Sequence, residues 1–434
     1  MKKLAQEVFR RTLEAIDIGA ALEKVLDREG AVIRAGAREM RIDLREFREI
    51  VGIAFGKAAF AMAEGFGRVV APDFPVEGIL VTPAKPPRGL PGWREFVAGH
   101  PIPNEASFAA GRAILGQLAR CDERTLVVFL ISGGGSALVE QPLDLSVGLA
   151  DFQALHAALV TCGAPIEEIN VVRKHLSATK GGRLAGAAAK SMKLTFAISD
   201  VPPGEEASIA SGPTLPDPST VADAERIAER CALAPKLSPG LRVIFEHHRL
   251  RETPKADDPA FARSQFACLL SMHDLFHAAH HACEAKGFVC ICDEATDGWP
   301  IEKAADHLLA QLATQKKAYP HDRVAVIADG ELSSPVTGNG TGGRNSAFVL
   351  ACVPKIAGKQ ITVLSAGTDG IDGNSAAAGA VADGETLGRG QKAGLDVRDF
   401  ERRSDAYTFF ERLGDAIVTG PTGNNLRDLR ILMA

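Results

Sequence analysis

One stretch of the chain, Thr125–Ile131, is almost uninterruptedly apolar and reads Thr-Leu-Val-Val-Phe-Leu-Ile. A strand that is apolar on both faces must be covered on both sides, which is typical of parallel sheets in α/β proteins. Similar short apolar segments alternate with segments of helical periodicity along both halves of the sequence. The sequence therefore predicts an α/β fold with mainly parallel sheets covered by helices.

The length of the chain, 434 residues, is more than a single ordinary domain holds, so two domains are expected. A proline- and charge-rich segment from about residue 235 to 263 suggests where they meet. We therefore predict an N-terminal α/β domain over residues 1–240 and a C-terminal α/β domain over residues 260–434.

The composition argues against two classes of partner. A net charge of −5 gives no electrostatic case for binding nucleic acid. No apolar run approaches the roughly 20 residues that a membrane span needs. The eight cysteines include no Cys-x-x-Cys pair, which favours reduced thiols in a reducing compartment. We expect a cytoplasmic enzyme.

A glycine-rich loop, Ser132-Gly133-Gly134-Gly135-Ser136, directly follows the apolar strand. Backbone amides of consecutive glycines and two hydroxyls suit an anion, so these residues are predicted to hold nucleotide phosphates. Another strand–glycine–helix junction, Gly56-Lys57, adds a positive charge in the same half. Its spacing is not that of a P-loop, and a surface lysine is the simpler interpretation of Lys57 by itself.

A second glycine-rich loop lies in the C-terminal half and precedes a predicted helix. Its candidate residues are Gly338, Gly340, Gly342, Gly343, Arg344 and Asn345. The first N–H groups of a helix have no partner within it, so this junction is predicted to bind a phosphate. Asp369 and Asp372 follow the next predicted strand. Acids at the carboxyl end of a strand suggest the metal ion that accompanies a nucleotide.

Two further segments carry charge. The run Arg173–Arg183 is strongly basic, and by itself it indicates a solvated face. Asp200 follows a strand predicted over Lys193–Ser199 and begins a long polar loop that contains Pro202 and Pro203. An acid in this position is a candidate site residue.

These segments together resemble the bacterial-type D-glycerate 2-kinase family, ATP-dependent kinases whose carboxyl-terminal half is called the MOFRL domain. The likeness covers nearly the whole chain in order. The matching segments are Gly56–Ala58, Gly99–Pro103, Ile131–Leu138, Lys174–Leu184, Ser199–Pro202, Ala210–Thr214, Gly338–Asn345, Ser365–Gly373, Ala377–Ala380 and Val418–Asn425. The resemblance implies two Rossmann-like domains with the active site in the cleft between them.

The resemblance also implies a reaction, the transfer of a phosphoryl group from ATP, with Mg²⁺, to the C2 hydroxyl of D-glycerate or a related sugar acid. It assigns the active-site charges to Lys57 and Arg344, and it places Lys180 among the residues that bind the nucleotide. Asp200 and Asp369 are the candidates for accepting the hydroxyl proton. The candidate Mg²⁺ ligands are Asp200, Glu331, Asp369 and Asp372.

The second domain departs from the family pattern, because Ala347 and Ala376 stand where the family usually has acids. A non-catalytic ATP-binding protein is therefore one alternative. An NAD(P)H-dependent hydroxypyruvate reductase is another, since the second loop also forms a GxGxxG motif. Pro335 in the preceding segment argues against that alternative. The expected partner is a small-molecule substrate, and a homodimer is the predicted assembly.

Overall fold

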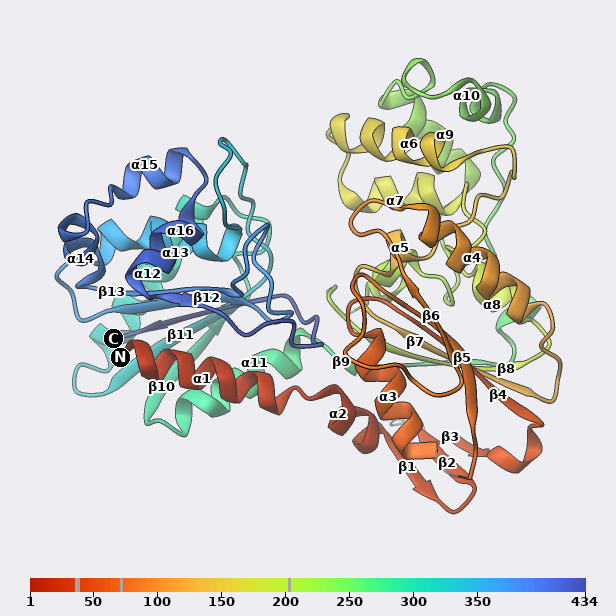
Figure 1. Ribbon diagram of the computed structural model, residues 1–434, viewed down its shortest axis with the longest axis horizontal. Helices are drawn as coiled ribbons and strands as arrows, with labels where there is room; N and C mark the ends of the chain where they lie inside the picture. The colour runs from red at the N-terminus through yellow and green to blue at the C-terminus, as the bar shows by residue number, and fades with distance from the viewer. Residues whose placement is uncertain (36–39, 71–72, 202–203) are drawn as a thin grey trace. The chain divides into compact units, whose positions relative to one another are not determined.

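The computed structural model describes residues 1–35, 40–70, 73–201 and 204–434. The chain forms two compact units (Figure 1). The first unit is Ile18–Leu269, and the second unit is Met1–Asp17 together with Leu270–Ala434. The first unit thus begins and ends later than the predicted range 1–240. The second begins at residue 270 instead of 260 and also includes the first 17 residues. Pro202 and Pro203, in the loop predicted after Asp200, lie outside the described residues.

The first unit is built on a six-stranded sheet in the order β6-β5-β4-β7-β8-β9. Its strands from β6 to β8 are all parallel, which confirms the predicted α/β class. All residues of β7 are buried, as its continuous apolar sequence requires. The strands are β4 (Glu49–Phe55), β5 (Val76–Thr82), β6 (Trp93–Val97), β7 (Thr125–Ile131), β8 (Met192–Ile198) and β9 (Ser264–Leu270).

The helices of the first unit follow the predicted alternation with strands. The helix over Arg183–Ala187 is short, and glycines in the left-handed region precede it. The helices are α2 (Ile18–Val25), α3 (Ala59–Val70), α4 (Glu105–Leu118), α5 (Gly135–Leu138), α6 (Leu149–Thr161), α7 (Ile166–Lys174), α8 (Arg183–Ala187), α9 (Val221–Arg230) and α10 (Pro239–Glu246). A small antiparallel sheet, β1 (Leu26–Glu29), β2 (Val32–Ala35) and β3 (Met40–Asp43), was not predicted.

The segment predicted as an interdomain boundary is packed within the first unit. Leu241, Ile244 and Leu250 are buried in a cluster with residues of α6, α7 and α9. The prolines and charges of this segment therefore lie around an apolar helix, and the chain passes to the second unit only after β9.

The second unit contains a mixed sheet in the order β10-β11-β15-β12-β13-β14. Only β10 and β11 pair in parallel, and the other four pairings are antiparallel. The parallel pattern expected for this half fails because β15 lies between β11 and β12 and runs against both. The strands are β10 (Phe288–Asp293), β11 (Arg323–Asp329), β12 (Thr362–Gly367), β13 (Gly379–Asp383), β14 (Ala416–Ile417) and β15 (Asp428–Met433).

The first helix of the chain, α1 (Lys2–Ala15), belongs to the second unit. Its Lys2 Nζ lies 2.7 Å from Asp415 Oδ2, and its Glu7 Oε1 accepts a hydrogen bond of 2.6 Å from Lys286 Nζ. The first residues of the chain thus form two helices, α1 and α2, that belong to different units. The other helices of this unit are α11 (Met272–Glu284), α12 (Ile301–Ala318), α13 (Arg344–Ile356), α14 (Thr386–Lys392), α15 (Val397–Arg402) and α16 (Ala406–Leu413).

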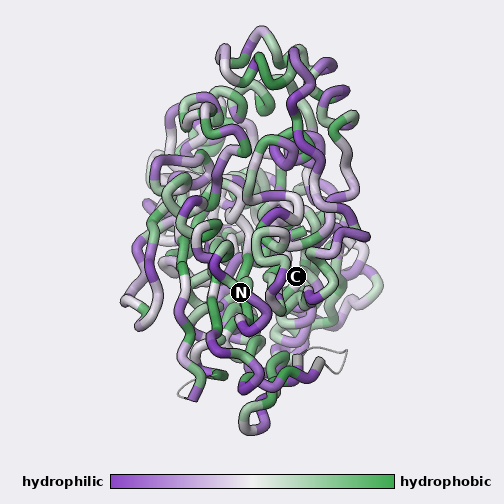
Figure 2. Tube along the Cα trace, turned by 90° about the vertical axis from the view of Figure 1, so that its right-hand side faces the viewer, coloured by the Kyte–Doolittle hydropathy of each residue, from purple (hydrophilic) through white to green (hydrophobic). Residues whose placement is uncertain are grey.

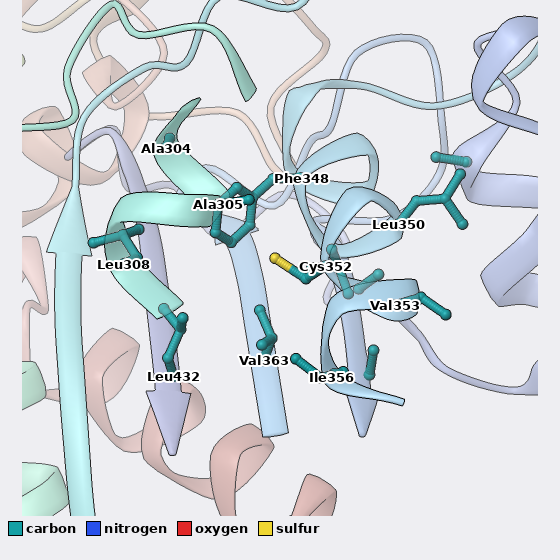
Figure 3. Close-up of a cluster of buried hydrophobic side chains, with 14 of the residues drawn as sticks. Ala304, Ala305, Leu308, Phe348, Leu350, Cys352, Val353, Ile356, Val363 and Leu432 are labelled. Atoms are coloured by element: carbon teal, nitrogen blue, oxygen red, sulfur yellow. The ribbon is translucent and has the colours of Figure 1, made fainter. Parts of the chain in front are cut away.

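The core of the second unit lies between its helices and the sheet. Figure 3 shows side chains of α12 and α13 meeting those of β12 and β15. Phe348, Val363 and Leu432 in this cluster are completely buried. Because these apolar contacts hold α13 in place, the polar groups of its first turn are held in fixed positions.

The hydropathy pattern shows how apolar residues are distributed along the chain. In Figure 2 they occur in short stretches interrupted by hydrophilic residues. No helix in the described part of the chain is long and apolar enough to cross a membrane.

Candidate active site

The sheet of the first unit has a topological switch point between β4 and β7. From β4 the chain continues to β5 and β6 on one side, and from β7 to β8 on the other. Ligands of doubly wound α/β proteins bind in the crevice that opens at the carboxyl ends of the strands at such a point. Gly56-Lys57 follows β4 and Ser132–Ser136 follows β7. Both loops therefore lie where this fold binds its ligands.

Hydrogen bonds join these two loops. The amide of Lys57 donates to Gly133 O at 3.1 Å, and the amide of Ala58 donates to Ser132 Oγ at 3.0 Å. Gly134 has a φ of +83°, a left-handed conformation that favours glycine. A Cβ on Gly134 would lie 3.0 Å from the His100 ring and 3.4 Å from Lys57 Cγ. The structure thus brings Lys57, His100 and the glycine loop together.

Lys180 lies behind the glycine loop in a buried ion pair. Its Nζ donates to Glu140 Oε2 at 2.7 Å, to Ser136 O at 2.8 Å and to Val139 O at 3.3 Å. Burial lowers the pKa of the Lys180 ammonium, and the charge of Glu140 opposes this shift. Since all three ammonium hydrogens have protein acceptors, Lys180 supports the loop from within in this structure. Glu140, its partner, was not predicted from the sequence.

The prediction that Arg173–Arg183 forms a solvated face is wrong for most of this run. Lys174 is buried beside Asp217, with an Nζ–Oδ1 distance of 3.2 Å, and His175 is also buried. Arg183 donates to the carbonyls of Arg251 and Glu252. The sequence of a basic run does not show that it is buried, because its carboxylate and carbonyl partners are distant in the chain. Arg173 in this run lines a cavity beside the glycine loop, a role that its sequence context did not indicate.

Asp200 lies two residues beyond the end of β8, the neighbour of β7. Its side chain is half-buried. This carboxylate is therefore on the same edge of the sheet as Lys57, as the sequence suggested.

In the second unit, Arg344 begins α13 and contacts two carboxylates. Its Nε lies 2.5 Å from Asp428 Oδ2, and its Nη2 lies 2.7 Å from Glu331 Oε1. Burial lowers the pKa of the guanidinium, but the two carboxylates outweigh it and the pKa is raised. Arg344 is therefore a firmly charged group. Asp428, which orients it, was missed because it lies 84 residues away in sequence.

The N-terminus of α13, predicted as a phosphate site, holds a carboxylate of the protein itself. Asp372 accepts hydrogen bonds from the amides of Gly343, Asn345 and Ser346 at 2.8 to 3.2 Å. Ser346 Oγ also donates to it at 2.6 Å. Burial raises the pKa of Asp372, and these hydrogen bonds oppose the shift. Both carboxylate oxygens already have donors, so Asp372 acts here as a helix cap.

The glycines of the second loop let it pass close to neighbouring backbone. Gly340 N donates to Arg403 O at 2.9 Å, and Gly342 N donates to Asn374 Oδ1 at 2.8 Å. A Cβ on Gly338 would collide with Arg403. Asn345 is buried and accepts from Ser365 Oγ at 2.6 Å. Its position in this loop is thus explained by packing within the second unit.

The remaining predicted metal ligands do not gather into a preformed site. Asp369 is half-buried, and its Oδ1 accepts from the amide of Ile371 at 3.0 Å. Glu331 is exposed and pairs with Arg344. Among the residues that the structure describes, there is no cluster of three histidine, cysteine or acidic side chains suited to a metal ion.

The fold defines the chain as a two-unit α/β protein whose first unit has a topological switch point, the place where such folds bind their ligands. Comparison with known proteins narrows this class. Residues 4–246 match a domain of unknown function, DUF4147, and residues 324–428 match the MOFRL family. The chain belongs to the glycerate 2-kinase family, which confirms the predicted resemblance.

Individual relatives are similar over most of the chain. A Thermotoga maritima protein named D-glycerate 2-kinase is 32% identical over 99% of this chain and 98% of its own. An Agrobacterium vitis protein named "Putative hydroxypyruvate reductase" is 37% identical over 88% of this chain and 86% of its own. The crystal structure of glycerate kinase from Thermotoga maritima matches with a TM-score of 0.83 and 31% identity. It covers 100% of this chain and 99% of that one.

Proposed function

We propose that the protein is an ATP-dependent kinase that converts D-glycerate to 2-phosphoglycerate and ADP. The observation that carries this proposal is the placement of Lys57 against Gly134 at the switch point of the first unit. Phosphoryl transfer needs positioned positive charge and backbone donors more than covalent chemistry, and this loop pair can provide both. The family membership of the chain supports the same reaction.

The residues of the first unit have distinct roles in this proposal. Ser132–Ser136 surrounds phosphate oxygens of the nucleotide, and Lys57 neutralises charge on the transferring group. The C2 hydroxyl oxygen of glycerate attacks the γ-phosphorus while the bond to the β–γ bridging oxygen breaks. Asp200, on the same sheet edge, is a candidate acceptor for the hydroxyl proton, and Asp369 is the other. Arg344 carries a second charge for a substrate anion.

A magnesium ion would fit this chain only together with the nucleotide. Mg²⁺ usually retains several waters and takes one or two carboxylates beside substrate phosphates, so a preformed cage is not needed. Asp200 in the first unit, or Asp369 and Glu331 in the second, would be its candidate protein ligands. Asp372 is less suited, because capping α13 occupies both of its oxygens. When bound, the ion would supply charge neutralisation on the phosphates.

The reductase alternative has weaker support from the site. A dinucleotide would place its pyrophosphate at the helix start after the GxGxxG motif. In this chain the start of α13 is occupied by Asp372, and the loop amides of Gly340 and Gly342 have protein acceptors. The homodimer and the cytoplasmic location stay predictions.

The direct test is incubation of the protein with Mg-ATP and a panel of small hydroxy acids, followed by phosphorus NMR. We expect a new phosphomonoester signal coupled to the C2 proton of D-glycerate. A parallel sample with NADH and hydroxypyruvate is expected to show no change in absorbance. ATP binding without turnover on any acid, or rapid NADH oxidation, would contradict the proposal.

A further inference from the structure

A cavity of about 130 Å³ lies directly beside the glycine loop of the first unit. Its walls come from that loop, from the loop before α4, and from α6 and α7. The residues that matter here are His100, Gly134, Ser136, Glu140, His156 and Arg173. At about 30 Å³ per water molecule, the cavity has room for roughly four waters, or for one small acid.

The charge of this cavity is positive. Glu140 is in its wall, but Lys180 neutralises it at 2.7 Å. In the described parts of the chain, the only side chain that hydrogen-bonds to the Arg173 guanidinium is His156, which accepts through Nδ1. Burial and the charge of Arg173 lower the pKa of His156, so the imidazole is the neutral partner. Arg173 therefore lines the cavity without an ion pair to a carboxylate of the described residues, although the charge of Glu140, which Lys180 holds, also acts on it.

We propose that this cavity binds the carboxylate of the acceptor acid, with Arg173 as the residue that recognises it. A guanidinium binds a carboxylate through two parallel hydrogen bonds, which fixes orientation as well as affinity. Arg173 supplies the charge from α7, and the carboxylate becomes its anionic partner. This inference rests on the proposed function, and it assigns the carboxylate neither to Lys57 nor to Arg344.

The same walls explain a preference for a short acid. Phe152, Leu155, Pro101 and Pro103 form apolar parts of the lining, so a second charge would be unpaired there. Gly134 and Ser136 of the glycine loop line the same cavity. In a cavity of about 130 Å³, a hydroxyl on the carbon next to the bound carboxylate would lie near the loop that is proposed to hold the phosphates. The chemical class selected is a 2-hydroxy acid of about three carbons.

The test compares Arg173→Gln with Arg183→Gln, an arginine of the same run whose donors bind backbone carbonyls. We expect Arg173→Gln to raise KM for D-glycerate at least about 30-fold, while KM for ATP changes less than about twofold. Arg183→Gln should leave both constants near wild type. Arg173→Lys keeps the positive charge but lacks the two parallel N–H donors of the guanidinium, so we expect it to retain part of the affinity for D-glycerate. This variant replaces Arg173→Gln in the test if Arg173→Gln folds poorly.

Calorimetric titration with D-glycerate, without nucleotide, separates this inference from the proposed function. Loss of glycerate binding in Arg173→Gln with binding retained in Arg183→Gln supports the inference, even if the wild type shows no turnover. Wild-type KM for glycerate in Arg173→Gln, in an active enzyme, overturns the inference and leaves the kinase function standing. A wild-type protein that neither binds nor phosphorylates D-glycerate overturns both.

Discussion

The carboxylate of Asp372 caps helix α13 through Ser346, whose amide and hydroxyl donate to it at 2.8 and 2.6 Å. The two residues are 26 positions apart, so the cap also ties the loop after β12 to the helix. A negative group at a helix start satisfies unpaired N–H groups and interacts favourably with the helix dipole. The protein thus places its own anion where a phosphate was predicted.

Removing this cap should destabilise the protein and create a vacant anion site. We expect Asp372→Ala to lower the free energy of unfolding by about 2–4 kcal/mol, because several buried donors lose their acceptor. Sulfate should then raise the Tm of the variant more than that of wild type, since the helix start can accept an external anion. Thermal and urea unfolding with and without sulfate measure both effects.

Asp396→Ala is a matched control, since Asp396 caps the exposed start of α15 through the amide of Arg398. It should cost only about 1 kcal/mol and show no sulfate response beyond that of wild type. An Asp372→Ala variant as stable as wild type would show that this carboxylate is available for another role, such as binding Mg²⁺.

The sequence was most informative where burial alone decides the structure. The bounds of β7 were predicted because a strand buried on both faces must be apolar throughout, and β4 was predicted as the strand before the Gly56-Lys57 junction. From these strands followed the two loops at the switch point, with Lys57 and Ser132–Ser136. The antiparallel insertion of β15 could not be predicted, since strand order depends on pairing between segments about 100 residues apart.

In the candidate site, too, local features were predicted from the sequence, whereas contacts between residues distant in sequence were not. Glycines indicated close backbone approach correctly, but not whether a ligand or the chain itself makes that approach. Asp372 at α13 and Glu140 beside Lys180 are partners that only the tertiary structure brings into place. The basic run was misread for this reason, because its acidic and carbonyl partners are distant in sequence.

Lys57 should be needed for catalysis and not for folding. It is proposed to neutralise charge on the transferring phosphoryl group, so Lys57→Ala should reduce kcat/KM by roughly 10²-fold. Its unfolding midpoint should stay close to that of wild type. Lys85→Ala, at an exposed position in the loop after β5, is the control and should retain full activity. Near-wild-type kinetics for Lys57→Ala would remove this lysine from the site.

Arg344 should affect both activity and stability. Arg344 is proposed to carry a charge for a substrate anion, so Arg344→Ala is expected to reduce kcat/KM by roughly 10²-fold. It also leaves Asp428, which is 4% exposed, without its arginine. That uncompensated buried charge should cost about 3 kcal/mol of unfolding free energy. Adding Asp428→Asn should restore stability but not activity, and recovery of activity would contradict a role in substrate binding.

The Lys180–Glu140 pair should be structural. Lys180→Met leaves a buried carboxylate unpaired and should destabilise the protein by about 3–5 kcal/mol. The double variant Lys180→Met with Glu140→Gln should recover much of that loss, because neither charge then remains buried alone. A double-mutant cycle in urea measures the coupling. A Lys180→Met variant that is fully stable but does not bind ATP would contradict this structural role. It would instead support the direct nucleotide contact that the sequence predicted for Lys180.

Asp329 should make stability fall with rising pH. The side chain is 1% exposed, and its Oδ2 has no hydrogen-bond partner among the described residues. Burial raises the pKa of this carboxyl to about 6, although Arg427 and Arg430 oppose the shift. An unfolded aspartate has a pKa of about 3.9, so between about pH 4 and 6 the native state retains a proton that the unfolded state has lost. The contribution of Asp329 to stability is therefore full below about pH 4 and is lost as the pH rises through 6.

Asp329→Asn removes this titration while keeping the shape of the side chain. The variant should match wild type near pH 4 and become more stable by about 2 kcal/mol at pH 7, where wild type carries a buried, incompletely paired charge. Urea unfolding from pH 4 to 8 measures the difference. Asp322→Asn, at an exposed position before the same strand, controls for the loss of one charge from the second unit. A constant difference between Asp329→Asn and wild type across this range would mean that Arg427, 3.7 Å from Oδ2, keeps Asp329 ionised throughout.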